Sequence, residues 1–147
     1  ITEDDCLGGL NFLESNFSGA IGFAAPELRS QLSVSDKVKD FTTGAVLDAL
    51  NSLGAAETCL AQNYDEFVDL LQRKHASSGI SDIVAIEPTI GPIKTCLIEL
   101  KETLSKEGIN LLLIRRNYDS LVWPHTSRGF FKVKKKLPEF LSTFQSG

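Results

Sequence analysis

Residues 90–114 constrain the fold most, because they join the clearest helical pattern in the chain to its most apolar run. Apolar residues recur there at intervals of three and four, which places them on one face of a helix: Ile93, Cys96, Leu97, Leu100 and Leu104. Pro92 stands where a first helical turn tolerates proline, and Gly108 stands where a helix commonly ends. Residues 111–114 are apolar without interruption, so we expect them to be buried on every side.

The other segments also favour helices. Helical spacing or helix-start signals predict helices over residues 3–21, 37–53, 57–76, 110–121 and 139–144, with short turns near residues 26–28 and 81–86. Residues 128–136 fit a helix or a strand. No hairpin pair and no βαβ unit is recognisable. The sequence therefore predicts an all-α fold, a single-domain irregular bundle of about five to seven helices over residues 1–147.

The chain has 147 residues, which is enough for one domain with a substantial core. No uninterrupted apolar run approaches the ~20 residues of a membrane span. Methionine is absent, and the acidic start before Cys6 is typical of a mature secreted protein, although a cleaved fusion is the alternative. The triplet at Asn16 matches an N-glycosylation acceptor. We therefore expect a secreted, extracellular protein.

The net charge of −4 is unevenly distributed. Residues 1–100 hold 15 acidic and 6 basic residues, whereas residues 101–147 hold 4 acidic and 9 basic residues. Overall acidity argues against nucleic acid as a partner. The basic C-terminal third permits a peripheral contact with an anionic membrane, through Lys132, Lys134, Lys135 and Lys136.

Three cysteines leave one unpaired if a disulfide forms. We expect the bridge between Cys59 and Cys96, because both lie early in strongly predicted helices; it would contribute roughly 3–4 kcal/mol on the chain-entropy model. Cys6 then remains to link two chains into a dimer. The alternative is that all three cysteines are reduced, small apolar residues.

No pattern in the chain indicates catalysis. There is no nucleophile elbow and no phosphate-binding glycine loop. His75 and His125 lack partners at metal-ligand spacing, and the cysteines stand singly, so we expect no metal site and no cofactor. The protein is therefore predicted not to be an enzyme.

Two functions fit this composition. The first is a carrier that binds and transports a small hydrophobic molecule, such as a fatty acid, another lipid or a terpenoid, in a cavity between helices. The expected ligand-binding residues are Phe17, Phe41, Tyr64, Phe67, Leu100, Leu112, Trp123 and Phe131, with Arg115 near an acidic head group. This hypothesis requires an internal void larger than one or two waters.

The second hypothesis is a secreted protein-interaction factor or inhibitor. It would act through a surface patch of aromatic and basic residues near Trp123 and Phe130, either on a protein partner or on itself as a dimer linked by Cys6. A filled hydrophobic core and a ligand pocket are both lined by apolar residues. The aromatic side chains alone therefore do not distinguish the two hypotheses.

Overall fold

The computed structural model describes residues 1–5 and 17–145 of the chain. They form two compact units, Ile1–Ile114 and Arg115–Gly147. The single domain predicted over residues 1–147 stays a prediction. Strands and helices alternate along the first unit in the order β1 (Ala20–Phe23), the 3-10 helix η2 (Pro26–Arg29), α1 (Asp36–Leu53), β2 (Thr58–Ala61), α2 (Tyr64–Ser78), β3 (Asp82–Ile86), α3 (Pro92–Ser105) and β4 (Asn110–Ile114).

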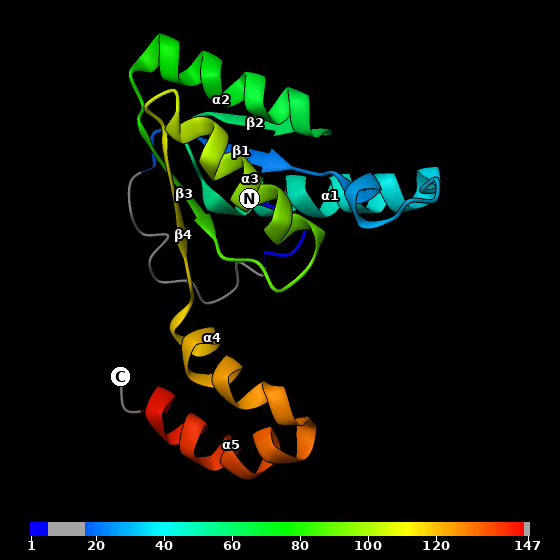
Figure 1. The fold of residues 1–147 in the computed structure, drawn as a ribbon, viewed down its shortest axis with the longest axis vertical. Coiled ribbons are helices and arrows are strands. Elements are labelled where there is room, and N and C mark those ends of the chain that lie inside the picture. The colour runs from blue at the N-terminus through cyan, green and yellow to red at the C-terminus, as the bar shows by residue number, and fades with distance from the viewer. Residues whose placement is uncertain (6–16, 146–147) are drawn as a thin grey trace. The chain divides into compact units, whose positions relative to one another are not determined.

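The first unit consists of two βαβ arrangements joined through α2 (Figure 1). β1 pairs in parallel with β2, so that Ala20 lies beside Thr58, and α1 connects them. β3 pairs in parallel with β4, so that Asp82 lies beside Asn110, and α3 connects them. Parallel neighbours need such a crossover because the chain must return to the same end of the sheet. The described strands thus form two separate two-stranded sheets.

The prediction of an all-α fold is therefore wrong, and the protein is a mixed α/β structure. β1 begins inside the helix predicted over residues 3–21, of which residues 6–16 lie outside the described part. β2 and β4 occupy the starts of the helices predicted over 57–76 and 110–121, and β3 replaces a predicted turn. The short runs that form these strands show no strict polar–apolar alternation in sequence, so they also fit a helical period.

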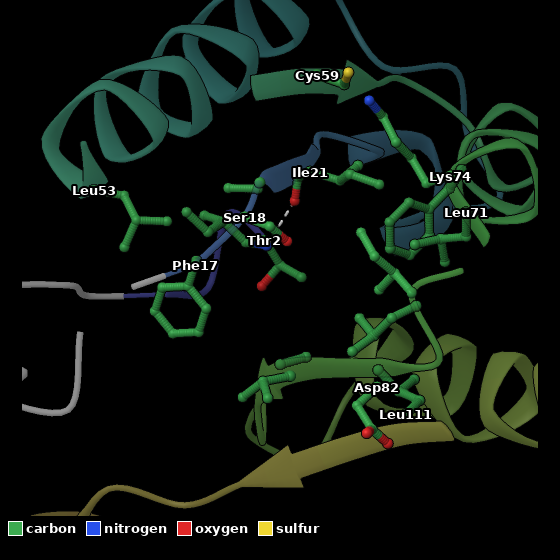
Figure 2. Close-up of a pocket in the computed structure, with 18 of the residues that line it drawn as sticks. Thr2, Phe17, Ser18, Ile21, Leu53, Cys59, Leu71, Lys74, Asp82 and Leu111 are labelled. Atoms are coloured by element: carbon green, nitrogen blue, oxygen red, sulfur yellow. Dashed lines mark hydrogen bonds between the residues drawn. The ribbon is translucent and has the colours of Figure 1, made fainter. Parts of the chain in front are cut away.

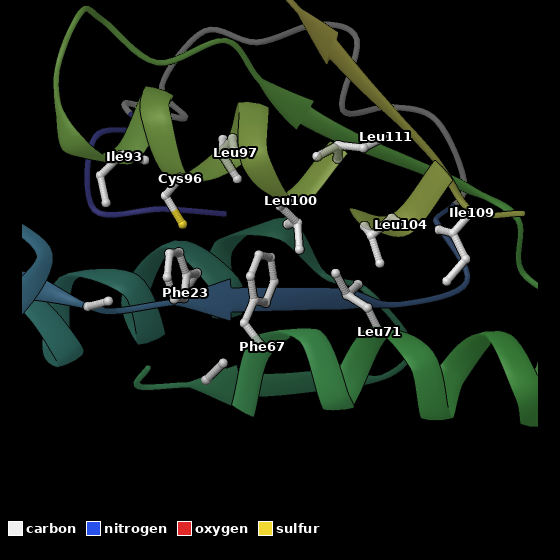
Figure 3. Close-up of a cluster of buried hydrophobic side chains, with 12 residues drawn as sticks. Phe23, Phe67, Leu71, Ile93, Cys96, Leu97, Leu100, Leu104, Ile109 and Leu111 are labelled. Carbon is white, nitrogen blue, oxygen red and sulfur yellow. The ribbon is translucent and has the colours of Figure 1, made fainter. Parts of the chain in front are cut away.

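The helix with the apolar stripe between Ile93 and Leu104 was predicted correctly. α3 begins at Pro92, and all five residues of its predicted apolar stripe are buried. Figure 3 shows Cys96 and Leu100 pointing from α3 toward Phe23 of β1 and Phe67 of α2. The rings of Phe23 and Phe67 stack with their centroids 4.6 Å apart. This core therefore joins β1, α2 and α3.

α1 covers the opposite face of β1 and β2. Ser35 is its N-cap residue, although its side chain makes no capping hydrogen bond. The helix buries Thr42, Val46 and Leu50, which recur every four residues. Phe41 of the same helix faces away from this contact and is 78% exposed.

In its described part the second unit contains helices and no strand. It consists of α4 (Asn117–Val122), the 3-10 helix η3 (Trp123–Arg128) and α5 (Phe130–Gln145). Pro138 lies inside α5, so the last helix starts well before the predicted residue 139. Within the residues that the structure describes, no helix is both long and apolar enough to span a membrane.

Candidate functional site

A cavity of about 210 Å³ lies between the two sheets of the first unit. Figure 2 shows Thr2 and Ile21 on the side of β1, and Asp82 and Leu111 on the side of β3 and β4. The wall is largely apolar and includes Leu53, Phe67, Leu71, Ile83, Val84 and Leu97. A single water needs only about 10–15 Å³ of such space, so the cavity is large enough for an organic group.

The cavity exists because both sheets pack on the same helices without pairing with each other. Phe23 and Ala61 of the first sheet and Leu111 of the second sheet belong to one buried cluster with residues of α2 and α3. Ile83 and Ala85 of β3 pack against the same cluster. α2 and α3 thus share one continuous core, whereas the described strands form two separate sheets with a gap between β1 and β3.

The first residues of the chain run along one side of this gap. Thr2 forms an isolated parallel bridge with Phe23. The amino group of Ile1 donates a hydrogen bond to the carbonyl of Ile21 at 2.8 Å, and the Phe23 N–H donates to the carbonyl of Ile1 at 2.7 Å. Burial lowers the pKa of the Ile1 amino group, and the nearby Asp5 carboxylate opposes that shift. Extended backbone therefore fits beside the second edge of β1.

Most polar side chains at the cavity form ion pairs or hydrogen bonds with neighbouring parts of the fold. Lys74 of α2 forms an ion pair with Glu57 before β2. Nδ1 of His75 lies 2.8 Å from the carbonyl oxygen of Ile80. Asp5 accepts a hydrogen bond from the Thr2 N–H at 2.7 Å, and burial raises the pKa of its carboxyl group. Over the described ranges, no group of three or more His, Cys, Asp or Glu residues is arranged to hold a metal ion.

The structure brings only some of the predicted ligand-binding residues to this cavity. Phe17 and Phe67 line it. Tyr64 packs on the core that borders it, and Leu100 is completely buried in that core. Leu112 is 41% exposed on β4 and does not line the cavity.

The remaining predicted residues also lie elsewhere. Phe41 belongs to the exposed side of α1. Trp123, Phe131 and Arg115 belong to the second unit. The Arg115 guanidinium lies over the Trp123 ring, 4.8 Å from its centroid, and Phe131 is 77% exposed.

Sequence reasoning missed the strand residues that line most of the cavity. The signal for β3 was present, since residues 83–86 form a short apolar run, β-branched except for Ala85, between Ser81-Asp82 and Glu87-Pro88. Such a run, bounded by turn-forming residues, is compatible with a buried strand. Residues 19–21 carry no comparable signal.

The predicted disulfide is not formed between the two described cysteines, which are both free thiols. Cys59 is partly buried on β2, and Cys96 is buried on α3 in the main core. Burial raises the pKa of Cys96 to about 11. Cys6 and Asn16, predicted for intermolecular pairing and glycosylation, lie outside the described residues.

Comparison with protein-family models, with curated proteins and with solved structures found no match.

Proposed function

We propose that the chain is a non-enzymatic binding protein that holds an apolar ligand in the cavity between β1 and β3. The observation that carries this proposal is the 210 Å³ cavity with its largely apolar wall. Ligand sites are commonly concave and apolar with a few polar groups at defined places, and Asp5, Lys74 and His75 are such groups here. The ligand lies between two sheets, not between helices as expected from the sequence. An extracellular location stays a prediction.

The size of the cavity sets the expected affinity. A small ligand that buries about 250 Å² of apolar surface gains about 6 kcal/mol at ~25 cal/mol per Å². Association entropy opposes this gain, so the dissociation constant for such a ligand should be on the order of 40 µM or weaker. Binding assays therefore need high protein concentration.

The proposal is tested by titrating the folded protein with hexafluorobenzene, a neutral apolar probe, and following the probe by fluorine NMR. Ser18 is an exposed residue that lines the cavity, so the indole of Ser18→Trp should fill the space. Ser105 is also exposed, at the end of α3 and away from the cavity, so Ser105→Trp is the matched control. We expect saturable binding to wild type and Ser105→Trp, and at least about tenfold weaker binding to Ser18→Trp.

Two results would contradict the proposal. The first is the absence of saturable binding to the wild-type protein. The second is equal affinity of both tryptophan variants, which would place the probe outside the cavity.

A second candidate function is contact of α5 with an anionic membrane surface. Phe130 and Phe131 are 67% and 77% exposed, and four lysines follow within the next residues of α5. The second unit carries seven Lys or Arg residues and two acidic residues. Exposed aromatic rings with nearby lysines favour the headgroup region of anionic lipids, where each lysine contributes about 1 kcal/mol.

The chain offers a matched pair of variants for this second candidate. Phe131→Ser removes an exposed ring from the basic unit, whereas Phe41→Ser removes a ring of nearly equal exposure, 78%, from the acidic unit. We expect the protein to sediment with vesicles containing phosphatidylserine and not with pure phosphatidylcholine vesicles. Phe131→Ser should weaken sedimentation and Phe41→Ser should not; equal effects would argue against a site on α5. A protein partner for the same surface stays a prediction.

A further inference from the structure

We infer that the ligand of this cavity is an extended apolar peptide that adds a parallel strand to the free edge of β3. The inference rests on the proposed function, because it assigns the chemical class of the ligand for the same cavity. It is carried by the position of the strand edges around the gap.

One edge of β3 is fully used by β4. The Asn110 N–H donates to the carbonyl of Ser81 at 2.6 Å, and the Glu87 N–H donates to the carbonyl of Ile114 at 2.7 Å. The backbone groups of successive residues in a strand point alternately to its two sides. The odd-numbered residues of β3 therefore direct their N–H and C=O groups toward β4.

The even-numbered residues direct their backbone groups to the other edge. All five residues of β3 line the cavity, and no described strand pairs with the edge of β3 opposite β4. An unpaired strand edge is a template for another extended chain. The free edge thus faces the same space that would hold the ligand.

On the other side of the gap, a segment of extended backbone already lies beside β1. Ile1 and Thr2 occupy the position of a strand beside Phe23, at the end of β1. The cavity continues this position beside residues 19–21, at the start of β1. A strand placed there would lie between β1 and β3 and would join the two sheets in the order β2, β1, added strand, β3, β4.

The surroundings also define the side chains of the peptide. Phe67, Leu71 and Leu97 reach the cavity from α2 and α3, so one face of the added strand must be apolar. A lipid would fill the same apolar space, but it would leave the N–H and C=O groups of Val84 and Ile86 without partners. A peptide satisfies both the apolar wall and the strand edge.

The experiment compares two peptides by fluorescence anisotropy. The first has five valines, which match the five residues of β3, flanked by lysines for solubility. The second is identical except for N-methylation of alternate valines, which removes backbone donors and blocks pairing. We expect saturable binding of the first peptide and at least about tenfold weaker binding of the second.

A change in the protein tests the same edge. Val84→Pro removes the N–H that faces the cavity without removing a donor to β4, and proline is tolerated on the free side of an edge strand. Val84→Thr keeps the N–H and the β-branched shape and is the control. Val84→Pro should weaken peptide binding about tenfold relative to Val84→Thr, because both variants change the same side chain of the cavity wall and only proline removes the backbone donor.

Amide exchange gives a readout that needs no variant. Adding the unmethylated peptide should slow exchange of the Val84 and Ile86 amides, and adding hexafluorobenzene should not. Equal binding of the two peptides, or no protection of these amides, would overturn the inference. If hexafluorobenzene binds and neither peptide binds, the inference is overturned and the proposed function stands. If neither hexafluorobenzene nor the peptides bind, the proposed function is overturned as well.

Discussion

Replacement of Gly22 by alanine tests how closely α1 packs on β1. Gly22 lies inside β1, and a Cβ atom there would lie 2.5 Å from Cγ1 of Val46 and 2.8 Å from Cδ1 of Leu50. Val46 is 1% exposed, and a β-branched side chain in a helix has one strongly preferred rotamer, so it cannot turn away freely. The added methyl group must therefore displace α1 or strain its side chains.

The expected magnitude follows from two opposing effects. Overpacking a close-packed core costs about 1–3 kcal/mol. Alanine also reduces the conformational entropy of the unfolded chain, which stabilises the folded protein by about 0.5–1 kcal/mol. Two side-chain atoms would lie under 3 Å from the new Cβ, so the overpacking cost should fall in the upper half of its range, about 2–3 kcal/mol, and Gly22→Ala should lower the free energy of unfolding by about 1–2.5 kcal/mol.

Gly44→Ala provides the matched control, because it makes the same chemical change on the exposed side of α1. No heavy atom lies within 4 Å of a Cβ placed at Gly44. Only the favourable effect remains there, so this variant should gain about 0.5–1 kcal/mol. Urea unfolding followed by circular dichroism measures both changes as shifts of the midpoint at constant slope.

The signs of the two shifts decide the question. If Gly22→Ala were as stable as the wild type, α1 would not be seated on β1 as the structure shows. If both variants lost stability equally, the effect would belong to alanine itself and not to the contact with Val46.

Iodoacetamide should label Cys59 faster than Cys96 in the folded protein, because Cys96 is buried and its pKa is raised to about 11; peptide mass mapping checks this, and equal labelling would contradict it. The stability that the protonated Cys96 thiol contributes should be complete below its ordinary pKa of 9.0 and should be lost as pH rises toward about 11, in urea titrations across that range. Arg116→Ala removes the contact of 2.5 Å with buried Asp119, so the fluorescence of the single tryptophan should report a loss of about 1–3 kcal/mol in the second unit. Lys136→Ala breaks a more exposed ion pair and should change stability by less than about 1 kcal/mol, so similar losses in both variants would refute the role given to Asp119.

Much of the helical structure was predictable from local pattern. The stripe from Ile93 to Leu104 reports a helix with one buried face, and that face is buried. The N-cap at Ser35 and the end of a helical segment before Gly108, which has φ +79°, were also predictable, because they depend on a few adjacent residues. A helix that is buried on one side has apolar residues at regular intervals in its sequence.

The sequence pattern of the strands is weaker. β4 is leucine-rich and has no alternation, so its composition does not separate a strand from a buried helix. The candidate site was less predictable still, because Ile21, Leu71 and Ile83 are distant in sequence and meet only when α2 and α3 cover both sheets. Phe17 and Phe67 were identified among many aromatic residues of similar character.

The sequence by itself determined the helices with one apolar face, the turns at particular residues and the basic character of the C-terminal third, since these are properties of neighbouring residues in the chain. Only the tertiary structure decided that residues 110–114 pair with β3, that Phe41 and Phe131 face outward, and that a gap separates two sheets. The physical reason is that strand pairing and burial depend on contacts between distant segments, and an apolar run carries no record of which segment will cover it.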